Sequence, residues 1–179
     1  MVSAILKTNI LIVGGYGAVG RVIAQTLADK FPGQVIVAGR NYEKANALAQ
    51  GSDGKIKPYQ LDLTTAHENP EILDGVAVVV MCLDVPDMRF VQQILQRGIH
   101  YVDITADDEI LQQIEALADV AKVGGSTAVL SVGLSPGLTN LLARYLQTQF
   151  DSVHQLDIYI SLGLGDAHGS AATRWTVQN

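Results

Sequence analysis

The feature that most limits the possible folds is a glycine-rich turn between an apolar run and a helical pattern. Residues 9–13 are largely apolar and lead directly into Gly14-Gly15-Tyr16-Gly17-Ala18-Val19-Gly20. Apolar residues then recur at helical spacing: Val19, Val22, Ile23, Leu27 and Phe31. A strand, a glycine turn and a helix in this order form the dinucleotide-binding fingerprint. Glycines let the backbone approach a diphosphate, and the helix start directs free N–H groups toward it. We therefore expect residues 14–20 to bind a nicotinamide dinucleotide.

Two glycine spacings overlap in this turn. Gly15, Gly17 and Gly20 give G-x-G-x-x-G, the usual dehydrogenase pattern. Gly14, Gly17 and Gly20 give G-x-x-G-x-x-G, which resembles the turn of short-chain-type nucleotide-binding proteins. Both spacings place Gly17 where the helix begins and Gly20 where the helix packs on the first strand. The sequence leaves open whether Gly14 or Gly15 leads the motif, and a tight turn without a ligand is the alternative interpretation.

Apolar, β-rich runs alternate with helical patterns along most of the chain. Predicted strands cover residues 9–13, 34–38, 56–61, 76–83, 100–104 and 126–132. Predicted helices cover residues 18–30, 42–50, 88–97 and 107–122, with a short turn at 70–73. This alternation predicts an α/β fold with a doubly wound, mostly parallel sheet and helices on both faces. We expect a Rossmann fold with strand order 3-2-1-4-5-6.

The pattern changes after Gly133. Residues 136–149 predict a helix, residues 153–162 alternate like a strand, and residues 163–169 form a polar, glycine-rich loop. We therefore expect a dinucleotide-binding domain over residues 1–150. Residues 151–179 are expected to begin a truncated substrate or dimerisation domain.

Charge and cysteine content exclude several classes of function. The formal net charge is −6, and the basic residues are scattered, so the footprint of a nucleic-acid-binding protein is absent. Cys82 is the single cysteine, and no Cys/His spacing suits a metal. No apolar run is long enough to cross a bilayer, and the first residues lack the basic leader of a signal peptide. We expect a cytoplasmic protein without a metal, a membrane anchor or a nucleic-acid partner.

The end of the second predicted strand indicates which dinucleotide is bound. NAD-preferring domains usually carry an acidic residue there, which bonds the ribose 2′-hydroxyl. This chain has Arg40 and Asn41 at that position, with Lys44 one turn further on. A guanidinium can hold a 2′-phosphate by charge-assisted bonds, each worth about 1.5–3 kcal/mol. We expect NADP(H) to bind more tightly than NAD(H) by roughly one to two orders of magnitude. A solvated surface arginine is the alternative interpretation.

Two more strand ends are expected at the same crevice, because ligands of such sheets bind beyond the carboxyl ends of the strands. Asp62 and Leu63 follow the third strand, where a carboxylate can accept a hydrogen bond from the adenine amino group. Cys82 and Leu83 end the fourth strand, where backbone atoms would line the nicotinamide ribose. We interpret Cys82 as a small buried residue rather than a nucleophile, because no basic residue lies near it in the sequence.

The chain resembles the nucleotide-binding domain of the saccharopine dehydrogenase-like reductases, which include saccharopine reductase and carboxynorspermidine dehydrogenase-like enzymes. The resemblance rests on residues 13–21, on Ala38-Gly39-Arg40-Asn41, on Tyr101-Val102-Asp103-Ile104-Thr105, and on residues 133–142, Gly-Leu-Ser-Pro-Gly-Leu-Thr-Asn-Leu-Leu. It extends to about residue 165, and the last two motifs are the more particular ones.

The resemblance implies an oxidoreductase that acts on CH–NH donors. Such enzymes bind NADP(H) or NAD(H) and reduce an imine formed between an amine and a 2-oxo acid or aldehyde. A second α/β domain supplies much of their substrate pocket and mediates dimerisation, so the full-length protein is expected to form a homodimer and the isolated fragment to be inactive. Asp103 and Thr105 are then expected beside the nicotinamide or substrate, or else as a cap for the following helix. His168 is a candidate proton donor, or else part of a disordered loop.

Two other functions remain open from the sequence. One is a non-catalytic NADP(H)-sensing module of short-chain-dehydrogenase-like type, since a fold does not dictate a function. The other is a flavin-binding protein, which fits poorly because Arg40 stands where an acidic residue is expected. Turnover of NADPH with an amine and a 2-oxo acid distinguishes the reductase from the sensor.

Overall fold

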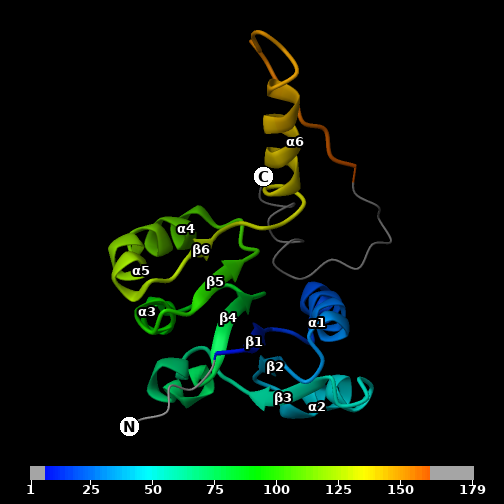
Figure 1. The fold of residues 1–179 in the computed structure, drawn as a ribbon, viewed down its shortest axis with the longest axis vertical. Helices are drawn as coiled ribbons and strands as arrows, with labels where there is room; N and C mark the ends of the chain where they lie inside the picture. The colour runs from blue at the N-terminus through cyan, green and yellow to red at the C-terminus, as the bar shows by residue number, and fades with distance from the viewer. Residues whose placement is uncertain (1–6, 162–179) are drawn as a thin grey trace.

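A computed structural model describes residues 7–161, which form a six-stranded, all-parallel sheet flanked by helices (Figure 1). The strands are β1 (Asn9–Val13), β2 (Val35–Gly39), β3 (Ile56–Gln60), β4 (Val76–Met81), β5 (His100–Asp103) and β6 (Ala128–Val129). The α-helices are α1 (Ala18–Lys30), α2 (Tyr42–Gln50), α3 (Met88–Gln96), α4 (Asp108–Glu115), α5 (Ala118–Gly124) and α6 (Leu138–Gln147). Two short 3₁₀ turns, Ala66–Glu68 and Pro70–Leu73, lie between β3 and β4. The strand order β3-β2-β1-β4-β5-β6 confirms the predicted Rossmann topology.

The sheet is buried on both faces, which explains why its central strands are continuously apolar. On one face, α1 and α2 cover alternate side chains of β1 and β2, with Ile12 and Val37 fully buried. On the other face, α3 and α4 cover a larger core centred on Phe90, Ile94 and Tyr101. Helices on both faces leave the carboxyl ends of the strands free to form a site.

Helix α1 contacts the sheet through smaller residues than predicted. The expected apolar stripe included Val19 and Val22, but these side chains are 47% and 62% exposed. The buried positions are instead Gly20, Ala24 and Ala28. Small side chains allow the helix axis to approach β1 and β2 closely, so the larger residues at neighbouring positions are turned outward. The prediction of the helix was correct and that of its buried face was wrong in part.

Other elements differ from the sequence prediction in length. The helix expected over residues 107–122 is divided into α4 and α5 around Ala116 and Leu117. Strand β6 spans only two residues, both paired with β5, instead of the seven predicted. Helix α6 begins at Leu138 because Gly137, with a φ of 124°, precedes it as the N-cap, so Pro136 is not the first helical residue. No strand forms over residues 153–161, where an alternating strand was expected.

Helix α6 extends away from the sheet (Figure 1), and its apolar residues Leu141, Leu142 and Tyr145 are all more than half exposed. Within residues 7–161, no helix combines the length and the apolar character needed to cross a bilayer.

Candidate functional site

The glycine turn joins the carboxyl end of β1 to the start of α1. Gly14 has a φ of 78°, a left-handed conformation that glycine adopts without the cost a side chain would impose. A Cβ atom on Gly15 would lie 3.0 Å from the carbonyl oxygen of Ile12 and from both methyl carbons of Val37. Gly14 is therefore favoured by its conformation, and Gly15 by the tight packing of Ile12 and Val37 around it. The two overlapping spacings describe one turn.

The last two glycines of the turn bring α1 close to β1. Gly17 is the N-cap of α1, and its N–H donates to the carbonyl of Gly14 at 2.9 Å. No side chain caps this helix. The N–H groups of Ala18, Val19 and Gly20 thus have no intrahelical acceptor and are available to a ligand at the carboxyl end of β1. A Cβ atom on Gly20 would overlap the carbonyl oxygen of Gly14, so only glycine permits this approach.

The carboxyl end of β2 carries Arg40, whose side chain is exposed beside the glycine turn. Its carbonyl oxygen accepts a hydrogen bond from Gln60 Nε2 at 3.1 Å. The next residue, Asn41, caps α2 by accepting from the Lys44 N–H at 2.9 Å. The Asn41 N–H in turn donates to the Tyr16 hydroxyl at 3.1 Å. The turn that carries Arg40 is therefore held by side chains from the glycine turn and from β3.

The carboxyl end of β3 places Asp62 near Arg40 and buries Leu63. Asp62 Oδ1 accepts hydrogen bonds from the N–H and the hydroxyl of Thr64, at 3.0 and 2.8 Å. These bonds, with a smaller contribution from the charge of Arg40, hold the pKa of Asp62 below its usual value. Leu63 is 7% exposed and packs in the core, so only its backbone is placed to face a ligand.

The carboxyl end of β4 places Cys82 and Leu83 next to the glycine turn. The Cys82 N–H donates to the carbonyl of Val13 at 2.9 Å, and the Leu83 side chain occupies the space where Gly14 lacks a Cβ. Burial raises the pKa of the Cys82 thiol to about 11. The thiol is therefore protonated near neutral pH, which agrees with its interpretation as a structural residue.

The carboxyl end of β5 forms a polar cluster with the segment after β6. Asp103 is 1% exposed, and its Oδ1 accepts from the Ser131 N–H at 2.8 Å. Its Oδ2 has no hydrogen-bond partner among the described residues, and burial raises the pKa of this carboxyl. Ser131 adopts a left-handed φ of 60° and donates its hydroxyl to the Thr105 carbonyl at 2.9 Å. Asp103 thus bridges β5 to the segment that leads to α6.

The cap of α4, for which the sequence offered Asp103 or Thr105, is Asp107. The Thr105 hydroxyl lies 3.3 Å from Asp84 Oδ1 and accepts from the Asp107 N–H at 3.2 Å. Asp107 is the N-cap of α4 and accepts from the N–H groups of Glu109 and Ile110. Neither Asp103 nor Thr105 caps the helix itself, although Thr105 supports the residue that does.

The cradle at the end of β1 fits a dinucleotide. It combines a turn in which Cβ atoms on Gly15 and Gly20 would crowd backbone atoms, a helix start without a side-chain cap, and the exposed cation Arg40. These are the features that a diphosphate and a further phosphate require. Within residues 7–161, no group of three or more His, Cys, Asp or Glu side chains is arranged to hold a metal ion.

A family model for the saccharopine dehydrogenase NADP-binding domain matches residues 10–129, from β1 to the end of β6. The chain belongs to this family. It is a saccharopine dehydrogenase-like nucleotide-binding domain, and the family's cofactor is a nicotinamide dinucleotide. No match is found among curated proteins.

Solved structures of other proteins share the fold of this saccharopine dehydrogenase-like domain. The apo saccharopine dehydrogenase (L-Glu forming) from Saccharomyces cerevisiae is 22% identical, with a TM-score of 0.57 over 79% of this chain and 31% of that one. Pen from Bacillus thuringiensis is 14% identical, with a TM-score of 0.55 over 72% of this chain and 50% of that one. The chain therefore spans about a third of the length of the yeast enzyme.

The structure adds supporting residues that the sequence did not indicate at the site. Gln60 and Ser131 hold the backbones of Arg40 and Thr105, and neither was expected at the site. No local motif identifies them, because each acts across neighbouring strands. Tyr16 was expected within the turn, but its contact with Asn41 was not. His168, the candidate proton donor, lies outside the described residues.

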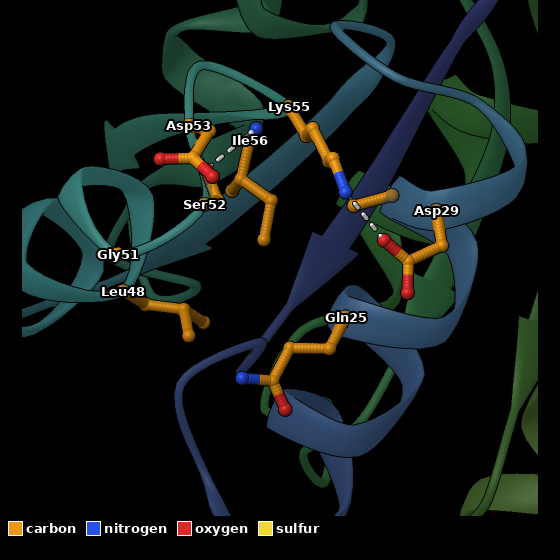
Figure 2. Close-up of a pocket in the computed structure, with 9 residues that line it drawn as sticks. Gln25, Asp29, Leu48, Gly51, Ser52, Asp53, Lys55 and Ile56 are labelled. Carbon is orange, nitrogen blue, oxygen red and sulfur yellow. Dashed lines mark hydrogen bonds and ion pairs between the residues drawn. The ribbon is translucent and has the colours of Figure 1, made fainter.

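A cavity of about 370 Å³ lies at the opposite end of the sheet from this site (Figure 2). It is lined by α1, by the end of α2 and by the loop that leads into β3. The ion pair between Lys55 Nζ and Asp29 Oδ1, 2.7 Å apart, lies at this cavity. The cavity is at the amino ends of the strands and is separate from the dinucleotide cradle.

Proposed function

We propose that this domain binds NADP(H) in preference to NAD(H) and serves an enzyme that reduces a carbon–nitrogen double bond. The substrate class is an imine formed between an amine and a 2-oxo acid or aldehyde. The observation that carries the cofactor proposal is Arg40 at the carboxyl end of β2, beside an uncapped helix start.

The position of Arg40 favours a 2′-phosphate over a free 2′-hydroxyl. Residues 38–42, Ala-Gly-Arg-Asn-Tyr, contain no carboxylate that could accept a bond from the ribose hydroxyl. Asp62, which lies close enough for the charge of Arg40 to lower its pKa, has its Oδ1 engaged by Thr64. A guanidinium pairs with phosphate oxygens through two directed N–H donors, which a hydroxyl cannot use in the same way.

The rest of the cradle would hold the diphosphate and orient the nicotinamide. N–H groups of Ala18, Val19 and Gly20 would donate to the diphosphate, where the helix dipole also favours negative charge. The backbone after β4 and the cluster of Asp103 and Thr105 after β5 would line the nicotinamide side, as the topology of the fold requires. When bound, a reduced nicotinamide supplies a hydride. The residues of this domain would bind and orient the dinucleotide. Asp103 holds the segment after β6 in place through its hydrogen bond to Ser131.

Two observations support the reductase proposal. The family match covers residues 10–129, and the fold is shared with a saccharopine dehydrogenase that forms L-Glu. Because only 31% of that enzyme is matched, we propose that the substrate pocket is completed by residues outside this domain. We also propose that the full-length protein acts as a homodimer.

Replacing Arg40 tests the cofactor proposal. Arg40→Ala should weaken NADPH binding by one to two orders of magnitude, since a charge-assisted interaction worth about 1.5–3 kcal/mol is lost. NADH affinity should stay within about twofold. Arg144→Ala is the matched control, because it removes one exposed positive charge from α6, at a distance from the cradle. Equal NADPH affinity in the Arg40 and Arg144 variants would refute the assignment.

Turnover tests the reaction class. The full-length protein, given NADPH, a primary amine and a 2-oxo acid, should oxidise NADPH only when both substrates are present. A sensing module would bind NADPH with the same selectivity and show no oxidation with any amine and oxo-acid pair.

A further inference from the structure

The Tyr16 side chain connects the two halves of the dinucleotide cradle. Its backbone belongs to the glycine turn, whereas its ring packs on Gly39 at the end of β2. A Cβ atom on Gly39 would lie 2.6 Å from ring atoms of Tyr16, so the ring rests directly on the strand backbone. The hydroxyl reaches further and accepts from the Asn41 N–H at 3.1 Å. One side chain thus contacts the residues on both sides of Arg40.

The turn of Arg40 and Asn41 is also held by a side chain from β3. Gln60 Nε2 donates to the Arg40 carbonyl at 3.1 Å. Asn41 is fixed further by its capping bond to the Lys44 N–H. Arg40 itself is exposed and forms no side-chain hydrogen bond among the described residues, so its direction depends on how firmly its backbone is held.

We propose that Tyr16 is a positioning residue that determines the preference for the 2′-phosphate, acting through the Arg40–Asn41 turn. This inference rests on the proposed NADP(H) binding and adds a residue to it. By fixing the turn before the ligand arrives, Tyr16 lowers the ordering cost of directing the guanidinium at a phosphate. The advantage concerns only ligands that contact Arg40, so NADH affinity is independent of it.

Tyr16→Phe tests the proposal because it removes the hydroxyl and keeps the ring on Gly39. One neutral hydrogen bond corresponds to about a three- to tenfold change in affinity. Titration calorimetry on the whole chain should therefore show NADPH binding weakened by about three- to tenfold, and NADH binding changed by less than about twofold. Tyr59→Phe is the matched control: Tyr59 is exposed on the edge strand β3, and its hydroxyl forms no hydrogen bond among the described residues.

A double-mutant cycle separates positioning from direct contact. In an Arg40→Ala background, Tyr16→Phe should have less than about a twofold effect on NADPH, because the group it positions is gone. Gln60→Ala removes the other support of the turn. It should reproduce the selective loss of NADPH affinity even if the Tyr16 variant folds poorly.

Three results would overturn the inference. An equal loss of NADPH and NADH affinity in Tyr16→Phe would show a general structural role. A full effect of Tyr16→Phe in the Arg40→Ala background would show a direct contact with the ligand. No NADPH binding by the unmodified chain would refute the proposed function as well, which distinguishes that failure from the other two.

Discussion

Replacing Gly20 with alanine perturbs the closest approach in the molecule between helix α1 and the glycine turn. The added Cβ atom would overlap the carbonyl oxygen of Gly14 and lie 2.8 Å from the Cα atom of Gly15. Both neighbours are backbone atoms of a turn held by the hydrogen bond from the Gly17 N–H to the Gly14 carbonyl. Neither can rotate away as a side chain can, so α1 must move.

Two opposing contributions set the size of the effect. Overpacking against groups that cannot rotate away costs up to about 3 kcal/mol. Alanine in place of glycine inside a helix returns about 1 kcal/mol. The net loss in the free energy of unfolding is therefore about 2 kcal/mol. For a domain of this size, that corresponds to a fall in Tm of roughly 4–8 °C.

Gly51→Ala is the matched control, because the nearest atoms to a Cβ at Gly51 are 3.8 Å away and its φ is −77°. It should leave the Tm unchanged or raise it slightly, since alanine restricts the unfolded chain. Thermal unfolding followed by circular dichroism measures both variants, and NADPH titration should show at least a tenfold weaker affinity only for Gly20→Ala. A Gly20→Ala variant with the same Tm and the same NADPH affinity as the wild type would refute the close-packing argument.

Two further predictions concern buried groups near the strand ends. Because burial raises the pKa of Asp103, the folded state loses stability as pH rises through that raised value. Asp103→Asn keeps an acceptor for the Ser131 N–H. Its Tm should exceed that of the wild type at about pH 8, and the difference in Tm should shrink toward about pH 4. A difference in Tm that does not change with pH contradicts this. Cys82, with a pKa of about 11 instead of 9.0, should react with iodoacetamide roughly a hundredfold more slowly than an exposed thiol, and equal rates contradict its burial.

The sequence predicted the order and type of the sheet elements because their patterns are local. Strand β4 is an unbroken apolar run, which is typical of a strand covered on both faces. The glycine turn was predictable for the same reason, since its residues are adjacent in the chain. The strand order followed from the fold class, and the structure confirms it.

The details that depend on packing were not predictable in the same way. Val19 and Val22 match an apolar stripe, but α1 approaches the sheet so closely that Gly20 and Ala24 occupy the interface. Strand β6 pairs only with Tyr101 and Val102 of β5, and Ser131, shortly after it, has a left-handed φ of 60° that an extended strand does not allow. These outcomes depend on distances between elements that no single segment contains.

The sequence did not predict the supporting contacts of the candidate site, for a related reason. Gln60 and Arg40 are 20 residues apart, and Asp103 and Ser131 are 28 apart, yet both pairs form hydrogen bonds across neighbouring strands. Side chains that hold another residue's backbone have no characteristic spacing. A single sequence predicts the residues that carry charge and the turn that carries the glycines, but not what holds them.

The preference for the 2′-phosphate is the central claim, and titration calorimetry of the unmodified chain with NADPH and NADH tests it most directly. We expect both cofactors to bind and NADPH to bind at least about tenfold more tightly, as about 1.4 kcal/mol of charge-assisted bonding requires. Equal affinities, or tighter binding of NADH, would contradict the role assigned to Arg40.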